Sequence, residues 1–319
     1  MLRKSAIAGS FYDNDPNKLK KTIEECFNHR LGPGNIPKLG GSKKVSSKEV
    51  SSKSSPNEHP PNKQHNKHIY GSIIPHAGYV YSGSIAAHAY YKLVETGFPK
   101  TFIILCPNHT GLGTGISIYD KGSWETPLGT VDIDEEFANS LISNSDIITP
   151  DTSAHMREHS CEIHLPFLQY FSNDFKIVPI VMWMQDMESA KEIGKAIAKT
   201  VKSNNEISNN EIKSDKESNS KYDISVIAST DLTHYQPQEI ANNQDKLILD
   251  SIANMDEFTL MKNIKEFNIS MCGYGPVIAT MESSRLLGAK KAKILKYATS
   301  GDISGDFSSV VGYGSAIFE

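Results

Sequence analysis

Short runs rich in β-branched residues alternate along most of the chain with longer amphipathic stretches. The apolar runs predict buried strands at HIYGSIIP, KTFIILCP, FKIVPIVM, YDISVIAST, KAKILKYA and YGSAIFE. The amphipathic stretches predict helices at residues 18–27, 84–94, 187–201, 245–255 and 276–287. Because strands that alternate with helices form a largely parallel or mixed sheet flanked by helices, the pattern predicts a single α/β domain over residues 1–319.

Two segments interrupt this pattern, at residues 40–68 and 202–221. Both are rich in Ser, Asn and Lys and contain almost no large apolar residues, so neither can pack into a core. We interpret both as flexible surface insertions. The histidines of the first segment, His59, His65 and His68, are therefore expected to be solvated loop residues rather than ligands.

Composition and charge exclude several classes of partner. A net charge of −4 offers no basic face for nucleic acid or for an anionic membrane, so a small molecule or a peptide is the expected ligand. No apolar stretch approaches the roughly 18 residues that cross a bilayer. The four cysteines show no CxxC spacing, which favours reduced thiols and a cytoplasmic location.

Polar residues follow three of the predicted strands at the point where each strand ends. His76 follows GSIIP, His109 follows FIILCPN, and Asp231 and His234 follow ISVIAST. Ligands of open α/β sheets bind beyond the carboxyl ends of the strands, so we expect these side chains at one sheet edge. Each histidine taken alone is more often a structural turn residue than a ligand, but three positions of the same kind favour a site.

Cysteine chemistry adds a further candidate. Cys272 lies in MCGYGP, just before a predicted helix whose dipole would favour the thiolate, the form that binds metal or attacks carbon. Cys106 and Cys161 are interpreted as small apolar residues of the core.

The segment HMREHSCEIHLPF is dense in ionisable groups. Residues 155–159 have the order H-x-x-E-H of inverzincin proteases, in which one helix supplies two zinc-binding histidines. The loop-like TPDTSA upstream favours another interpretation, in which Glu158, His159 and Glu162 face the site and orient its ligands.

Several co-linear motifs resemble those of the Memo-like proteins over residues 3–316: AGSFY, PHAGYVYSGSIAAHAY, PNHTG, WETPLGT, EHSCEIHLPF, STDLTHY and CGYGP. The resemblance implies a fold related to class III extradiol dioxygenases, which hold non-haem Fe(II) with two histidines and one carboxylate. It implies His76, His109 and Cys272 as metal ligands, with iron preferred and copper or zinc as alternatives.

The resemblance also implies roles around these ligands. His234 would act as an acid or base, with Asp231 orienting it or serving as an extra ligand. Tyr79, beside His76 in its motif, is expected to line the cleft or to lie just behind the ligands. Relatives in prokaryotes are often encoded near a radical-SAM protein and an AMMECR1-like protein, which makes those proteins candidate companions.

Three functions remain open from the sequence. The first is a metal-dependent, dioxygenase-like redox enzyme. The second is a non-enzymatic module that binds a peptide or metabolite in the same cleft. The third is a cysteine hydrolase with Cys272 as nucleophile and His76 or His234 as base. In the second function, aromatic residues would line the groove: Tyr79, Tyr81, Trp124, Tyr235 and Tyr274.

Overall fold

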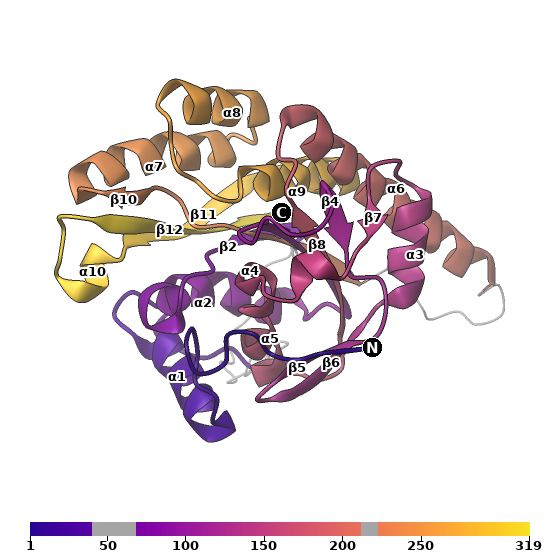
Figure 1. The fold of residues 1–319 in the computed structure, drawn as a ribbon, viewed down its shortest axis with the longest axis horizontal. Helices are drawn as coiled ribbons and strands as arrows, with labels where there is room; N and C mark the ends of the chain where they lie inside the picture. Colours follow the sequence, from indigo (N-terminus) through magenta and orange to yellow (C-terminus); the bar gives the residue numbers. More distant parts are fainter. Residues whose placement is uncertain (40–67, 212–222) are drawn as a thin grey trace, which may run out of the picture.

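A mixed sheet forms the centre of the computed structural model, which describes residues 1–39, 68–211 and 223–319 (Figure 1). The strands are β1 (Leu2–Arg3), β2 (Gly71–Ile74), β3 (Thr101–Pro107), β4 (Ile116–Ile118), β5 (Ser123–Thr126), β6 (Gly129–Ile133), β7 (Thr149–Pro150), β8 (Lys176–Met182), β9 (Ile224–Ser229), β10 (His234–Gln236), β11 (Ala292–Thr299) and β12 (Val310–Phe318). Their order is β1-β5-β6-β8-β3-β9-β2-β12-β10, with β11 paired to β12 and β4 joining β8 to β7. All six strands expected from the sequence are present, as β2, β3, β8, β9, β11 and β12.

The middle of the sheet is parallel, and antiparallel pairs flank it on both sides. Strands β6, β8, β3, β9 and β2 run in one direction. The pairs β5 with β6, β2 with β12, and β11 with β12 are antiparallel. Because β3, β9 and β2 are consecutive and parallel, their carboxyl ends lie next to one another at one edge.

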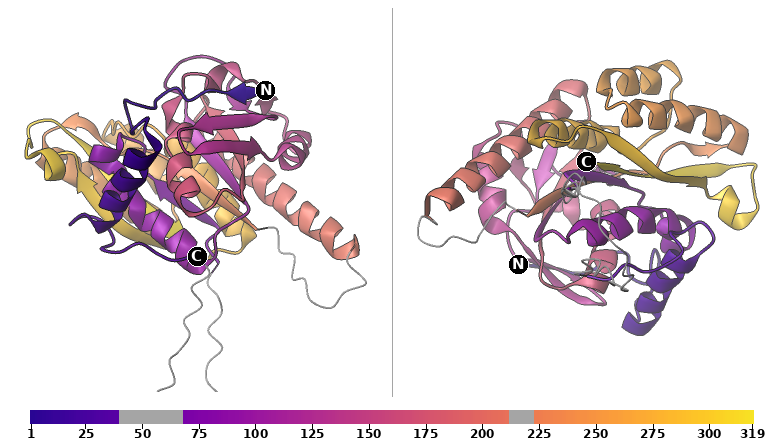
Figure 2. Two further views of the ribbon diagram at one scale, coloured as in Figure 1. Left: turned by 90° about the horizontal axis from the view of Figure 1, so that it is seen from below. Right: turned by 180° about the vertical axis from the view of Figure 1, so that it is seen from behind.

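Helices cover both faces of the sheet (Figures 1 and 2). They are α1 (Pro16–Asn28), α2 (Tyr79–Thr96), α3 (Glu135–Ser143), α4 (His159–Glu162), α5 (Leu165–Phe171), α6 (Met187–Glu211), α7 (Gln238–Ala253), α8 (Glu257–Glu266), α9 (Tyr274–Leu287) and α10 (Gly301–Ser304). Strand β3 shows how the two cores arise. Ile103 and Leu105 pack with α3, α6 and α9, whereas Phe102 and Ile104 pack with α1, α2 and α5. None of the described helices is long and apolar enough to cross a membrane.

The five expected helices are confirmed as α1, α2, α6, α7 and α9, with different ends. Helix α2 begins at Tyr79, whereas the sequence predicted a start at residue 84. The first turns were missed because residues 82–87 are all buried, so this part of the helix has no polar face and shows no amphipathic pattern. Helix α6 continues to Glu211, which corrects the expected start of an insertion at residue 202. The rest of that insertion, from residue 212, and residues 40–67 with His59 and His65 lie outside the described residues.

Candidate metal centre

Three neighbouring strands bring polar residues to one edge of the sheet. His76 follows β2, His109 follows β3 and Asp231 follows β9, each two residues beyond its strand. Since β3, β9 and β2 are adjacent and parallel, the expectation that these residues share an edge is confirmed.

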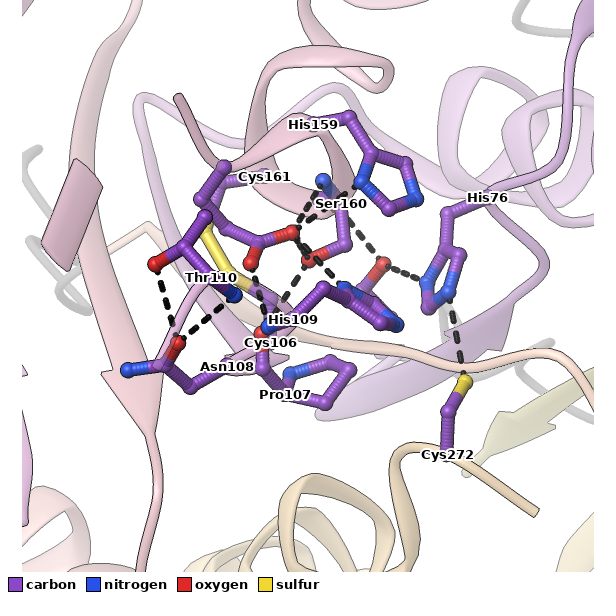
Figure 3. Close-up of polar contacts among 12 residues, drawn as sticks. His76, Cys106, Pro107, Asn108, His109, Thr110, His159, Ser160, Cys161 and Cys272 are labelled. Atoms are coloured by element: carbon purple, nitrogen blue, oxygen red, sulfur yellow. Dashed lines mark hydrogen bonds and ion pairs between the residues drawn. A yellow bond between two sulfur atoms is a disulfide. The ribbon is translucent and has the colours of Figure 1, made fainter. Parts of the chain in front are cut away.

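The imidazoles of His76, His109 and His159 gather at this edge (Figure 3). One ligand atom from each ring lies within 4.8 Å of the others. The ring centroids of His109 and His159 are 4.5 Å apart, and that of His76 lies 5.2 Å from His109 and 5.3 Å from His159. Imidazole nitrogens suit zinc, copper and iron, so this geometry fits a transition-metal ion.

A buried carboxylate, Glu158, orients two of the three rings. Its Oε1 lies 2.9 Å from His109 Nδ1 and 3.3 Å from His159 Nδ1, and its Oε2 accepts the His109 backbone N–H at 2.7 Å. Burial alone would raise the pKa of Glu158, but the hydrogen bond from His109 and the charges on both histidines lower it to about 2. An ionised Glu158 accepts the Nδ1–H of His109 and lies beside Nδ1 of His159, which leaves Nε2 of each ring free for a metal.

His76 is almost fully buried, at 2% exposure. Its backbone N–H donates to Asp231 Oδ1 at 2.9 Å, and its Nδ1 lies 2.8 Å from Ser229 Oγ. Burial, followed by the charges on His159 and His109, holds the pKa of His76 well below its ordinary value. The ring is therefore neutral, which is the form that binds metal.

Cys272 lies beside His76, with its Sγ 3.3 Å from His76 Nε2. Burial and then the charge of Asp231 raise the pKa of the Cys272 thiol. The expected thiolate is therefore not favoured, because desolvation and a nearby carboxylate outweigh the dipole of α9, which begins two residues later.

Asp231 and His234 complete the neighbourhood. Burial raises the pKa of Asp231 to about 6, against the opposing hydrogen bond from His76 and the charge on His234. His234 begins β10, and its Nδ1–H donates to the Ser270 carbonyl at 2.8 Å. Its charge lowers the pKa of both His76 and Asp231, so it lies within electrostatic reach of the site.

Known proteins resemble the chain over its full length. The family model described as Memo-like protein matches residues 3–317. The chain belongs to the Memo-like family. A MEMO1 family protein of Methanothermobacter thermautotrophicus is 47% identical over 98% of this chain and 99% of its own. Another, of Methanobrevibacter smithii, is 49% identical over 100% of both chains. The crystal structure of an uncharacterised Escherichia coli K12 protein shares the fold, with a TM-score of 0.52, 12% identity and coverage of 78% of this chain and 100% of that one.

Two residues of this Memo-like protein that were expected near the site make other contacts. Glu162 accepts from Arg3 Nη1 at 2.5 Å, from Tyr12 Oη at 2.7 Å and from backbone N–H groups of residues 6 and 7. It therefore binds the N-terminal segment instead of orienting a histidine. Tyr79 is buried, and its hydroxyl donates to the Ile163 carbonyl at 2.8 Å, so it joins α2 to the segment between α4 and α5.

The inverzincin interpretation of residues 155–159 is wrong. His155 ends a short 3₁₀ helix, Ser153–His155, and α4 begins only at His159, so no continuous helix presents both rings. His155 is fully buried against Tyr119 and Trp124, with ring centroids 5.5 and 5.8 Å away. It is a core residue.

Cys106 and Cys161 form a disulfide, with Cα atoms 5.9 Å apart (Figure 3). This corrects their interpretation as separate apolar residues and the expectation that the cysteines are all reduced. Cys106 lies three residues before His109, and Cys161 two residues after His159. The disulfide thus joins the segments that hold two of the three imidazoles.

Two residues beside the site were not predicted from the sequence. His164 and Ser229 are buried, and both belong to the hydrogen-bond network of His76. Ser229 is the last residue of β9, so its place at a strand end was an available signal. No sequence signal distinguishes His164 from its neighbours.

Proposed function

We propose that this Memo-like protein binds a transition-metal ion between His76, His109 and His159 and uses it for redox chemistry on a small molecule. The observation that carries the proposal is the convergence of three imidazole ligand atoms within 4.8 Å of one another. The donor set suits iron, with copper and zinc as alternatives, and the bound metal would supply an electron-accepting centre.

Two ligand sets share His76 and His109 and differ in the third ligand. His159 completes the group in space, whereas Cys272 follows from the family motif. Because Cys272 Sγ approaches Nε2 of His76 at 3.3 Å, it is a fourth donor that would bind only after losing its proton. We propose His159 as the third ligand and Cys272 as an accessory one.

Proton transfer would fall to His234 and Asp231. His234 is partly exposed, and its Nδ1–H is held by the Ser270 carbonyl, so Nε2 remains to exchange a proton with a substrate. Asp231 holds the His76 backbone in place through its Oδ1.

Elemental analysis of anaerobically purified protein tests the proposal. Wild type should contain near-stoichiometric iron, copper or zinc, and His109→Ala should lose it. His88→Ala is the matched control, because His88 lies on α2 and its Nε2 contacts the Leu31 carbonyl, away from the group. A folded, metal-free wild type would contradict the proposal. Metal loss in His159→Ala but not in Cys272→Ala would select the three-imidazole set.

A peptide- or metabolite-binding module is the second candidate, and exposed aromatic residues favour it. Tyr81 is 44% and Tyr235 76% exposed, and after burial the charges of Asp231, Tyr81 and Tyr235 raise the pKa of Tyr313. Both tyrosines, like Asp231, thus lie within electrostatic reach of Tyr313, whereas Trp124 is fully buried. Loss of ligand binding in His234→Ala at unchanged metal content would support this function.

The cysteine hydrolase meets its geometric requirement but not its electrostatic one. Cys272 Sγ is within hydrogen-bond reach of His76 Nε2, at 3.3 Å. Burial and Asp231 nevertheless raise the pKa of the thiol, which opposes formation of the nucleophilic thiolate.

A further inference from the structure

A series of buried hydrogen bonds extends from His76 away from the other two imidazoles of the candidate metal centre. Ser229 Oγ lies 2.8 Å from His76 Nδ1 and 2.8 Å from His164 Nε2, and His164 Nδ1 lies 2.7 Å from Tyr90 Oη. All four side chains are at most 2% exposed. They come from α2, β9 and the segments after β2 and α4, so the series of hydrogen bonds joins four separate parts of the fold.

We propose that Ser229, His164 and Tyr90 form a relay that fixes the proton of His76 on Nδ1, so that Nε2 always presents a lone pair to the metal. The relay acts through positioning residues, since only His76 would touch the metal. The claim that the relay strengthens metal binding rests on the proposed function. The claim that the proton of His76 is on Nδ1 does not depend on it.

Ser229 fixes the direction of these hydrogen bonds, because its Oγ has a third neighbour, the Ser160 carbonyl, at 2.7 Å. A carbonyl oxygen can only accept, and a serine hydroxyl has one proton to give. The Ser229 proton therefore points at Ser160, because any other orientation would leave two oxygen lone pairs facing each other in the core. Both imidazoles must then donate to Ser229, His76 from Nδ1 and His164 from Nε2.

The proton positions at the far end of the relay, on His164 and Tyr90, are fixed in the same way. Burial, followed by the charge on His159, lowers the pKa of His164 to about 3, so this ring is neutral and carries one proton. With that proton on Nε2, Nδ1 of His164 is bare and accepts the Tyr90 hydroxyl. Every hydrogen bond of the relay therefore has one direction, and all directions are consistent.

As a consequence, Nε2 of His76, on the side of the candidate metal centre, carries no proton. This nitrogen lies 3.3 Å from Cys272 Sγ, so in the metal-free protein it accepts a hydrogen bond from the neutral thiol. The hydroxyl relay thus does for His76 what the Glu158 carboxylate does for His109, without burying a second charge.

Nitrogen-15 NMR of metal-free, histidine-labelled full-length protein tests the relay, because imidazole shifts separate a protonated nitrogen from a bare one. Wild type should show His76 protonated at Nδ1 and bare at Nε2. In Ser229→Ala the proton should redistribute between the two nitrogens, and the affinity for zinc should fall ten- to hundredfold. Ser229→Thr keeps the hydroxyl and should restore both readouts.

Ser225→Ala is the matched control. Ser225 is buried in the same strand, and its Oγ has no hydrogen-bond partner among the described residues. Its removal should change neither the His76 shifts nor the zinc affinity. Tyr90→Phe, a mild change at the far end, should shift the His76 proton in the same direction as Ser229→Ala but less.

The outcomes separate the relay from the metal site. A proton on Nε2 of His76 in wild type would overturn the relay, as would a folded Ser229→Ala protein with the wild-type tautomer and zinc affinity. A wild type that binds no zinc but keeps the proton on Nδ1 would overturn the proposed function and leave the assigned tautomer standing.

Discussion

The two sides of the candidate metal centre fix the tautomers of their imidazoles by different chemistry. On the carboxylate side, the ionised Glu158 accepts Nδ1–H of His109 and lies beside Nδ1 of His159. On the hydroxyl side, the neutral Ser229 accepts Nδ1–H of His76. A carboxylate can only accept, so it fixes a tautomer by itself, whereas a hydroxyl does so only when its own proton is already committed. The hydroxyl side therefore depends on a longer chain of residues.

The largest expected effect is on the stability of the carboxylate side. Removing the disulfide in the double variant Cys106→Ala/Cys161→Ala opens a loop of 55 residues, which should lower the free energy of unfolding by about 4 kcal/mol. Denaturant titration under non-reducing conditions measures this. An unchanged midpoint would show that the two segments are held without the disulfide.

The second largest effect is expected when the Glu158 carboxylate, which accepts the hydrogen bond from His109, is replaced by a neutral amide. Glu158→Gln places an amide that can donate where His109 requires an acceptor, so zinc affinity should fall about a hundredfold. Glu162→Gln is the contrast, since its carboxylate binds the N-terminal segment and its loss should lower stability with little effect on affinity. Equal losses of affinity in the two variants would contradict the assigned difference between them.

Acid should weaken the relay at a higher pH than it protonates Glu158. The pKa of His164 falls from 6.5 to about 3 on folding, so the unfolded chain binds more protons between those values. The contribution of His164 to the free energy of unfolding is fully present above pH 6.5. It should decline toward pH 3 by about 1.4 kcal/mol per pH unit. Glu158, lowered from 4.5 to about 2, loses its contribution only below pH 4.5. His164→Gln should lower the slope of the unfolding free energy against pH between 4.5 and 6.5 by about 1.4 kcal/mol per pH unit, while the other buried histidines keep their contributions. An unchanged slope would argue against a neutral His164.

The smallest effect is expected for the accessory thiol. Cys272→Ser should reduce zinc affinity by less than about tenfold, because three imidazoles remain. Isothermal titration measures this. A loss as large as that of His109→Ala would move Cys272 into the primary ligand set.

Strand ends were predictable from the sequence, and strand neighbours were not. Apolar runs followed by His76, His109 and Asp231 identify the edge, but the order β3-β9-β2 depends on pairing between segments far apart in the chain. The helices α3 and α8 were missed although Asp134 and Asp256 cap them, with side chains that accept from Phe137 N–H and Thr259 N–H.

Contacts inside the dense segment after residue 154 could not be deduced from spacing. His155, His159 and His164 lie in one short stretch, but they belong to the core, the three-imidazole group and the relay respectively. The break before α4 decides this, because it turns Glu158 and His159 toward the strand ends. Pairing of Cys106 with Cys161 follows from the same packing and has no signature in the cysteine spacing.

The most direct test of the three-imidazole site is a crystal structure of zinc-loaded protein with anomalous scattering at the zinc edge. The ion should lie about 2.0–2.1 Å from Nε2 of His76, His109 and His159. An ion bound through Nδ1 of any of these rings, or by His76, His109 and Cys272 with His159 turned away, would contradict the account.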